Sequence, residues 1–173
     1  LESIFFQTYR KFKILIIYDD EDRSDLAHIK KFILKKKIKK KFYIKIIINK
    51  KNLGAGESRN IGIRFSKSKY IAFLDSDDIW CKNKLKLQLN FMNKYQVPIS
   101  HTSYNIINEL GKKISSRKSR KMLSYKDILS SCDIGLSTVM INLKFLKSNN
   151  LKFPKIKTKE DYVLWLKILK KVS

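Results

Sequence analysis

The chain has 173 residues, of which 43% are hydrophobic and 12% are aromatic. This apolar content supplies the core of one globular domain and excludes a disordered or collagen-like protein. No apolar run approaches the roughly 20 residues that a membrane-spanning helix needs, so we expect no bilayer crossing. The first residue is Leu1, without a secretory signal pattern after it, and we expect the start of the domain to be missing.

The chain is strongly basic, with 39 Lys and Arg against 15 Asp and Glu and a formal net charge of +24. Only six of the 39 are arginine, the residue on which nucleic-acid readers rely, so specific nucleic-acid binding is not expected. Three explanations of this charge stay open: codon bias in an AT-rich genome, attraction to anionic phospholipid, and nonspecific nucleic-acid binding. The densest cluster is the lysine-rich run 35–41.

The cysteines and histidines indicate no metal or disulfide framework. Cys81 and Cys132 are isolated and lack CxxC spacing, which is typical of a reducing, cytoplasmic setting. His28 and His101 are far apart and no nucleophile signature accompanies either, so both are interpreted as structural or surface residues.

The first half of the chain predicts a strand–helix alternation. Residues 13–18 and 43–48 are β-branched and nearly continuous in apolar character, as in strands covered on both faces, and 70–74 forms a third strand. Asp25 is placed to cap a helix between the first two strands, and 57–67 predicts a helix before the third. The order indicates a right-handed βαβαβ unit.

The second half is expected to complete one domain. Its polar stretch 111–121 predicts a mobile loop. The remaining elements are a helix that starts near Asn83 and buries Leu85, Leu89 and Met92, strands within 97–104 and 137–142, and a terminal helix over 159–171.

Two acidic clusters follow predicted strands. Asp19 and Asp20 come after the first strand, and Asp75, Asp77 and Asp78 come after the third. Ligands of open α/β sheets bind at the carboxyl ends of strands, and crowded carboxylates repel one another unless a cation neutralises them. Mg²⁺ or Mn²⁺ held by one or two carboxylates would keep positions open for phosphate oxygens. The alternative is an acidic turn that caps the next helix.

Two further segments carry candidate functional residues. The loop 52–60 fails the dinucleotide fingerprint, because Arg59 stands where the third glycine belongs, and it lacks the Walker pattern. It is either an anion-binding helix start with Arg59 one turn in, or a plain strand-to-helix turn. Glu160 and Asp161 open the last helix, with Thr158 as the expected N-cap. They either complement the helix dipole or supply a general base.

Taken together, four segments resemble family 2 nucleotide-sugar glycosyltransferases of the GT-A fold. They are QTYRKFKILIIYDD (7–20), NLGAGESRNIGI (52–63), YIAFLDSDDIW (70–80) and TKEDYVLWL (158–166). The resemblance implies an α/β, Rossmann-like domain with a mixed, mainly parallel sheet flanked by helices. This single, partial domain would span residues 1–173.

The resemblance also implies a role for each candidate residue. Asp19 and Asp20 would lie against the base of the donor nucleotide, with Arg59 near the same pocket. Residues 138–140 would help line the acceptor side. Asp75 would contact the ribose side of the donor and bind the metal, Asp77 would bind Mn²⁺ or Mg²⁺, and Asp78 would lie near the donor. Asp161 would be the catalytic base, with Glu160 as the alternative.

The expected activity is inverting transfer of a sugar from a nucleotide-diphosphate donor to a hydroxyl of a glycan or lipid-linked acceptor, in surface-polysaccharide biosynthesis. The chain departs from the family pattern because a first strand and helix would precede Leu1, and Glu21–Asp22 replaces a common Gly-Ser pair. It also stops soon after the proposed base. The alternatives are a basic module for anionic membranes or nucleic acid, and a degenerate transferase that binds nucleotide without turnover. We expect a cytoplasmic protein in peripheral contact with the inner face of the membrane.

Overall fold

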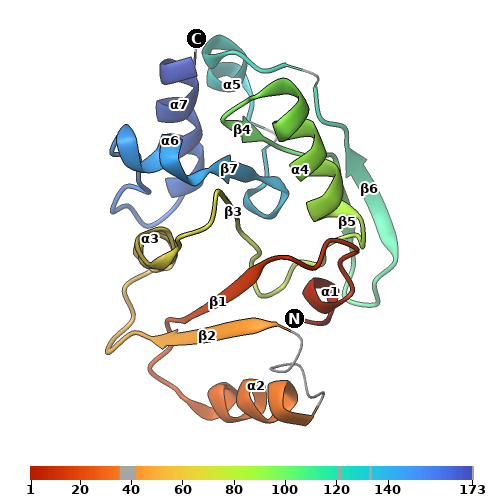
Figure 1. Ribbon diagram of the computed structural model, residues 1–173, viewed down its shortest axis with the longest axis vertical. Coiled ribbons are helices and arrows are strands. Elements are labelled where there is room, and N and C mark those ends of the chain that lie inside the picture. The colour runs from red at the N-terminus through yellow and green to blue at the C-terminus, as the bar shows by residue number, and fades with distance from the viewer. Residues whose placement is uncertain (36–41, 121, 133, 173) are drawn as a thin grey trace.

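The computed structural model describes residues 1–35, 42–120, 122–132 and 134–172 (Figure 1). Most of the lysine-rich run, residues 36–41, therefore lies outside the described residues. The elements in chain order are α1 (Glu2–Phe5), β1 (Lys13–Tyr18), α2 (Ser24–Lys35), β2 (Tyr43–Ile48), α3 (Ala55–Phe65), β3 (Tyr70–Ala72), α4 (Lys84–Tyr95), β4 (Ile99–Ser100), β5 (Tyr104–Ile107), β6 (Lys113–Arg117), α5 (Tyr125–Ser130), the 3₁₀ helix η2 (Leu136–Thr138), β7 (Met140–Asn142), α6 (Leu143–Ser148) and α7 (Glu160–Val172).

The strands form three small sheets rather than one. β1 and β2 pair in parallel, with Lys13 opposite Tyr43 and Tyr18 opposite Ile48. β3 and β4 each pair antiparallel with β7, which lies between them. The expected α/β class with mixed strand directions is confirmed, but antiparallel pairings outnumber the parallel one among the described strands. In particular, β3 pairs with β7 and does not continue the sheet of β1 and β2.

The prediction of a mobile loop over 111–121 is wrong for residues 113–117, because they form strand β6, which makes an antiparallel hairpin with β5. Gly111 makes the turn at a φ of 75°, a value that glycine adopts without strain. The hairpin is exposed on most positions of both strands. Polar residues are therefore compatible with a strand at this exposed position, and a prediction from polarity alone mistook the strand for a loop.

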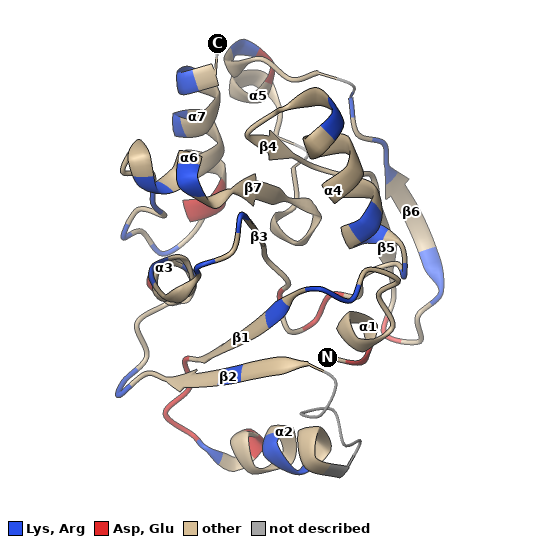
Figure 2. Ribbon diagram, in the orientation of Figure 1, with Lys and Arg blue, Asp and Glu red and all other residues tan. Residues whose placement is uncertain are grey.

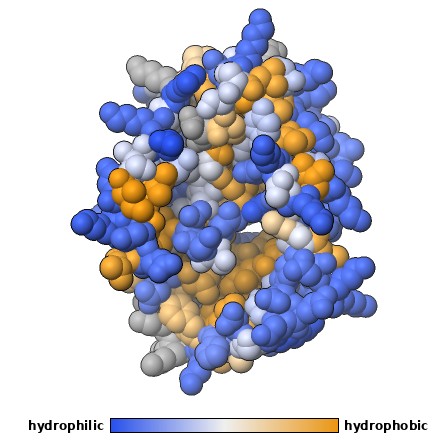
Figure 3. Space-filling model, turned by 180° about the vertical axis from the view of Figure 1, so that it is seen from behind, coloured by the Kyte–Doolittle hydropathy of each residue, from blue (hydrophilic) through white to orange (hydrophobic). Residues whose placement is uncertain are grey.

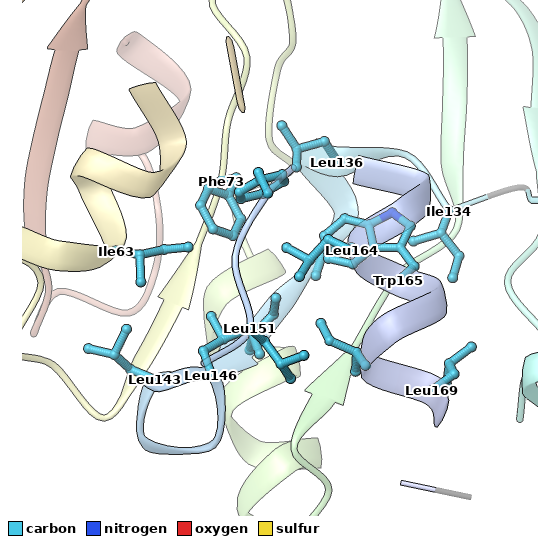
Figure 4. Packing of buried hydrophobic residues seen from close by; sticks show 14 of the residues in the cluster. Ile63, Phe73, Ile134, Leu136, Leu143, Leu146, Leu151, Leu164, Trp165 and Leu169 are labelled. Carbon is cyan, nitrogen blue, oxygen red and sulfur yellow. The ribbon is translucent and has the colours of Figure 1, made fainter. Parts of the chain in front are cut away.

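The main core gathers around α7, β7 and α6 (Figure 4). Trp165 is fully buried and meets Phe153 edge to face with ring centroids 6.3 Å apart, and Phe153 in turn meets Phe73 at 5.4 Å. Such aromatic pairs add about 0.5–1.5 kcal/mol each beyond the burial of their area. This chain of rings fixes the first half of α7 beside the segment that follows β3.

The sheet of β1 and β2 is less covered than its apolar sequence predicts. Ile14 and Tyr18 are buried, but Leu15, Ile16 and Ile17 between them are only partly buried. The prediction of strands covered on both faces is therefore not met along most of β1. No helix of the described residues is both long and apolar enough to span a bilayer.

Candidate active site

The carboxyl end of β1 is tied to the start of α3 through Asp19. The carboxylate of Asp19 accepts hydrogen bonds from the Asn49 side chain at 2.7 Å and from the backbone N–H of Leu53 at 2.8 Å. Buried Asn49 also donates to Ser58 Oγ at 2.9 Å. Asp19 is therefore a fixed carboxylate at the rim of the strand, held by the loop that precedes α3.

Asp20 is exposed and begins the turn into α2. Its carboxylate accepts a hydrogen bond from the backbone N–H of Asp22 at 3.1 Å, and Asp22 accepts from the N–H of Ser24, the first residue of the helix. Asp22 therefore satisfies the helix start, and the prediction that Asp25 caps this helix is wrong because Asp25 lies inside its first turn. Asp20 keeps an accessible carboxylate.

The acidic turn after β3 contains one partly buried and two exposed carboxylates. The backbone N–H of Asp75 donates to Ser137 Oγ at 3.0 Å, and the N–H of Asp78 closes the turn on the Asp75 carbonyl. Burial raises the pKa of Asp75, Arg59 opposes that rise, and the charges of Asp78 and Asp77 add to it. Asp77 and Asp78 both project from the turn into solvent.

Arg59 links the acidic turn to the last helix. One guanidinium nitrogen lies 3.0 Å from Asp75 Oδ1, and another hydrogen bonds to Glu160 Oε1. The guanidinium also lies over the ring of Phe153, 5.6 Å from its centroid. The side chain of Glu160 is only 12% exposed. The resemblance implies that Arg59 lies near the base pocket, which stays a prediction, and in the structure its ionic partners are Asp75 and Glu160.

Asp161 lies one residue beyond the buried Glu160, at the start of α7. Its Oδ1 accepts from the backbone N–H of Tyr162 at 2.7 Å, and the residue is only partly buried. Lys159, which precedes the helix at a φ of 62°, accepts the Val163 N–H, so Lys159 occupies the capping position predicted for Thr158. Of the two acids, Asp161 is the one free of the ion pair with Arg59.

The acidic segments between β1 and α2 and at the start of α7 are visible in Figure 2. Among the described residues no three His, Cys, Asp or Glu side chains converge as a protein-only metal site. Mg²⁺ and Mn²⁺ sites that use substrate phosphates need only one or two carboxylates. Exposed Asp77, with the neighbouring Asp75 of the same turn, meets that lower requirement.

Sequence reasoning missed two residues that position the site. Buried Asn49 follows β2 as Asp19 follows β1, so its place at a strand end was the available signal. Ser137 holds both ends of the acidic loop, because its Oγ accepts from Asp75 and its carbonyl accepts from Trp80 Nε1 at 2.7 Å. Residues 138–140, expected to line the acceptor side, are buried in the structure, and Met140 lines a cavity that also includes Asp75.

The α/β fold, with fixed and exposed carboxylates at strand ends and a further acid at a helix start, agrees with the GT-A fold that the sequence resembles. Residues 1–150 match the family described as Glycosyl transferase family 2. The chain therefore belongs to that family, which confirms the resemblance found in the sequence.

Two relatives illustrate the match. The chain is 40% identical over 176 residues to an uncharacterized glycosyltransferase of Rickettsia felis, covering 100% of this chain and 28% of that protein. It is 36% identical over 173 residues to Escherichia coli WfgD, a UDP-Glc:α-D-GlcNAc-diphosphoundecaprenol β-1,3-glucosyltransferase, covering 98% of this chain and 63% of WfgD. The chain thus spans less than two thirds of either relative.

Solved structures confirm the fold. TarS of S. aureus in complex with UDP superposes with a TM-score of 0.73 at 20% identity, over 97% of this chain and 49% of the TarS chain. The mannosyltransferase PcManGT of Pyrobaculum calidifontis, solved with GDP-Man and Mn²⁺, gives a TM-score of 0.70 at 11% identity, over 96% of this chain and 46% of that chain.

Proposed function

We propose that this domain, spanning residues 1–173, transfers a sugar from a nucleoside-diphosphate donor to a hydroxyl group of a glycan or lipid-linked acceptor, with inversion at the anomeric carbon. The observation that carries the proposal is the connection through Arg59. It joins Asp75, in the acidic turn, to Glu160, the neighbour of Asp161. Arg59 thereby holds two kinds of carboxylate at one edge of the fold: those of the acidic turn, which are suited to a metal-bound diphosphate, and that of Asp161, which is suited to accept the acceptor's proton.

Each carboxylate has a distinct proposed duty. Asp77 and Asp75 would hold Mn²⁺ or Mg²⁺, which when bound neutralises the charge of the departing diphosphate. Asp19 and Asp20 would contact the base of the nucleotide, and Asp78 would lie beside the donor. PcManGT, solved with GDP-Man and Mn²⁺, supports this use of a divalent ion by the fold.

The reaction follows from these duties. The acceptor oxygen forms a bond to the anomeric carbon while the bond from that carbon to the diphosphate oxygen breaks, and the nucleoside diphosphate leaves. Asp161 accepts the proton of the acceptor hydroxyl, because its carboxylate is accessible and makes no ion pair with Arg59. Glu160 is assigned a structural role, since its carboxylate is buried and already bound by Arg59. A single displacement gives inversion.

The setting we propose is peripheral contact with the anionic inner face of the cytoplasmic membrane, in polysaccharide biosynthesis. WfgD is named for a diphosphoundecaprenol-linked acceptor, and TuaG of Bacillus subtilis, 35% identical over 129 residues, is named for teichuronic acid biosynthesis. Lys and Arg are spread over the helices and over β6 (Figure 2). Each lysine near an anionic surface contributes about 1 kcal/mol of attraction.

Calorimetry tests the donor site directly. UDP and GDP are titrated into the chain at fixed salt with Mn²⁺, with EDTA, and with Mn²⁺ on Asp77→Asn. Glu109→Gln, in the turn of the β5–β6 hairpin, removes an equal charge as a control. We expect binding that EDTA and Asp77→Asn weaken at least tenfold and that Glu109→Gln leaves unchanged. Binding that is indifferent to metal and to Asp77, but falls steeply with salt, would instead indicate a basic binding module.

A further inference from the structure

The β5–β6 hairpin projects from the body of the domain as an ordered unit. All of its residues from 105 to 114 are exposed, and Figure 1 draws it along the edge of the molecule. At its base the backbone N–H of Ser119 donates to Ser103 Oγ at 2.9 Å. At its turn the N–H of Asn108 donates to the Lys112 carbonyl at 2.9 Å, and the N–H of Lys112 donates to Asn108 Oδ1 at 2.8 Å. These bonds fix the turn, so its side chains are held out in solvent.

Large aliphatic residues stand at this exposed turn. Leu110 is 92% exposed and Ile114 is 67% exposed, and Ile106 and Ile107 of β5 are exposed as well. In Figure 3, which shows the molecule from behind, hydrophobic residues lie exposed among hydrophilic ones on the side where Figure 1 draws β6. Turns that face water are normally built from polar residues and glycine. Clustered apolar residues at such a place mark a surface that meets a non-aqueous partner.

The same hairpin is strongly basic. Residues 104–120 contain one acidic residue, Glu109, and five basic residues: Lys112, Lys113, Arg117, Lys118 and Arg120. Two of the lysines stand directly between Leu110 and Ile114 in the sequence. A lysine stem lies along apolar surface while its ammonium group stays among polar groups. Apolar side chains bordered by lysine are typical of segments that lie in the interface of an anionic bilayer.

Two other partners fit this surface less well. Proteins that bind single-stranded nucleic acid stack the bases on aromatic rings, and residues 105–120 contain no aromatic residue. A second copy of the hairpin would bring two basic surfaces together, and like charges across an interface are costly. A bilayer with anionic headgroups accommodates both the aliphatic and the basic side chains.

The base of the hairpin adjoins the segment that holds the acidic turn. Tyr104, the first residue of β5, lies beside Gly135, where a Cβ would be 3.9 Å from Tyr104 Cε1. Two residues further on, Ser137 Oγ accepts the backbone N–H of Asp75. A bilayer bound at the hairpin would therefore hold the candidate site close to its surface, where a lipid-linked acceptor lies.

We propose that the β5–β6 hairpin docks the domain on a bilayer that carries anionic headgroups. Leu110 and Ile114 enter the boundary between headgroups and acyl chains, and Lys112 and Lys113 lie among the headgroups. The proposal rests on the membrane setting of the proposed function and names the surface that makes the contact. It differs from adsorption by the general positive charge of the chain, because it requires the aliphatic pair as well as the lysines.

Sedimentation with lipid vesicles tests the aliphatic pair. The chain is mixed with vesicles of phosphatidylcholine and anionic phosphatidylglycerol, and with vesicles of phosphatidylcholine alone. Leu110→Ser/Ile114→Ser should weaken partitioning into the anionic vesicles about tenfold or more, because two large aliphatic side chains no longer leave water. The matched control Leu34→Ser/Leu87→Ser changes leucines that are 62% and 63% exposed on α2 and α4, and it should leave partitioning within about twofold of the unaltered chain.

The same assay tests the charge. Lys112→Gln/Lys113→Gln should weaken partitioning into the anionic vesicles roughly 25-fold, at about fivefold for each lysine, and vesicles of phosphatidylcholine alone should bind the unaltered chain weakly. No binding to anionic vesicles, equal binding to both kinds of vesicle, or equal weakening by the two serine variants would each overturn the proposal.

Tryptophan fluorescence then locates the residue that enters the bilayer. The native Trp80 and Trp165 are both buried, so Leu110→Trp adds an exposed indole at the turn. On anionic vesicles its emission should shift to shorter wavelength and be quenched by lipids brominated in their acyl chains, whereas Leu87→Trp on α4 should show neither change. A vesicle-bound Leu110→Trp without the shift would overturn the proposal. Neither readout uses nucleotide or metal, so loss of vesicle binding and loss of donor binding are separate results.

Discussion

Replacing Arg59 with methionine removes the ion pairs that join the acidic turn to α7 while keeping most of the aliphatic volume. The side chain of Glu160 is only 12% exposed and that of Asp75 is 39% exposed. Breaking a buried pair by removing one partner typically costs 3–5 kcal/mol, because a charge is left uncompensated. The packing of the guanidinium on Phe153 adds about 1 kcal/mol. Because Asp75 is partly solvated, we expect a total loss of about 3–4 kcal/mol.

Urea unfolding measures this loss. With a slope of about 2 kcal/mol per molar urea, the midpoint of Arg59→Met should fall by roughly 1.5–2 M. Arg64→Met is the matched control, because its pair with Glu57 has side chains 58% and 37% exposed and should contribute below about 1 kcal/mol. Adding Glu160→Gln to Arg59→Met should recover about half of the loss, since it removes the buried charge. Equal midpoints for Arg59→Met and Arg64→Met would refute the reasoning.

Three further predictions concern other parts of the molecule. Burial lowers the pKa of Lys84 to about 7, so above pH 7 the folded chain has released a proton that the unfolded chain still holds until the ordinary pKa of lysine is reached. The free energy of unfolding should therefore rise by about 1.4 kcal/mol per pH unit between pH 7 and 9, and this rise should be absent in Lys84→Met. Asn49→Leu should cost about 2 kcal/mol in urea unfolding, because the Asp19 carboxylate and buried Ser58 both lose their donor. A loss below about 0.5 kcal/mol, roughly half of one typical hydrogen bond, would contradict this. Asp161→Asn should keep the metal-dependent affinity for nucleotide within about twofold while transfer falls at least 10²-fold, and unchanged transfer would remove Asp161 from its role as base.

The sequence predicted elements best where the pattern was long. Strands 13–18 and 43–48 agree with β1 and β2 residue for residue, and the terminal helix is displaced by a single residue. Short elements were predicted less accurately, because β4 has two residues and β7 has three, which is too few to show any periodicity. Strand pairing was the property that the sequence predicted least well. Nothing local in residues 70–74 indicates that β3 pairs antiparallel with a strand some 70 residues later.

The candidate site was foreseeable in its parts but not in its connections. Carboxylates after apolar strands are a local signal, and both acidic clusters lie at strand ends as expected. The partners of Arg59 are separated from it by 16 and 101 residues, so no spacing rule connects them. Ser137 was equally inaccessible, because a lone serine before a short strand has no distinguishing pattern.

The different environments of Glu160 and Asp161 follow from helix geometry. Successive residues of an α-helix are rotated by about 100°, so neighbours in sequence face different surroundings. The rotation directs Glu160 toward Arg59 and the N-terminal turn of α3, where its Cγ would lie 3.2 Å from a Cβ at Gly56. Asp161 is turned away from that contact, and its carboxylate accepts only the Tyr162 N–H among the described hydrogen bonds. A glycine at position 56 is therefore part of the same arrangement, because a larger residue would displace Glu160 and, with it, the ion pair that fixes the start of α7.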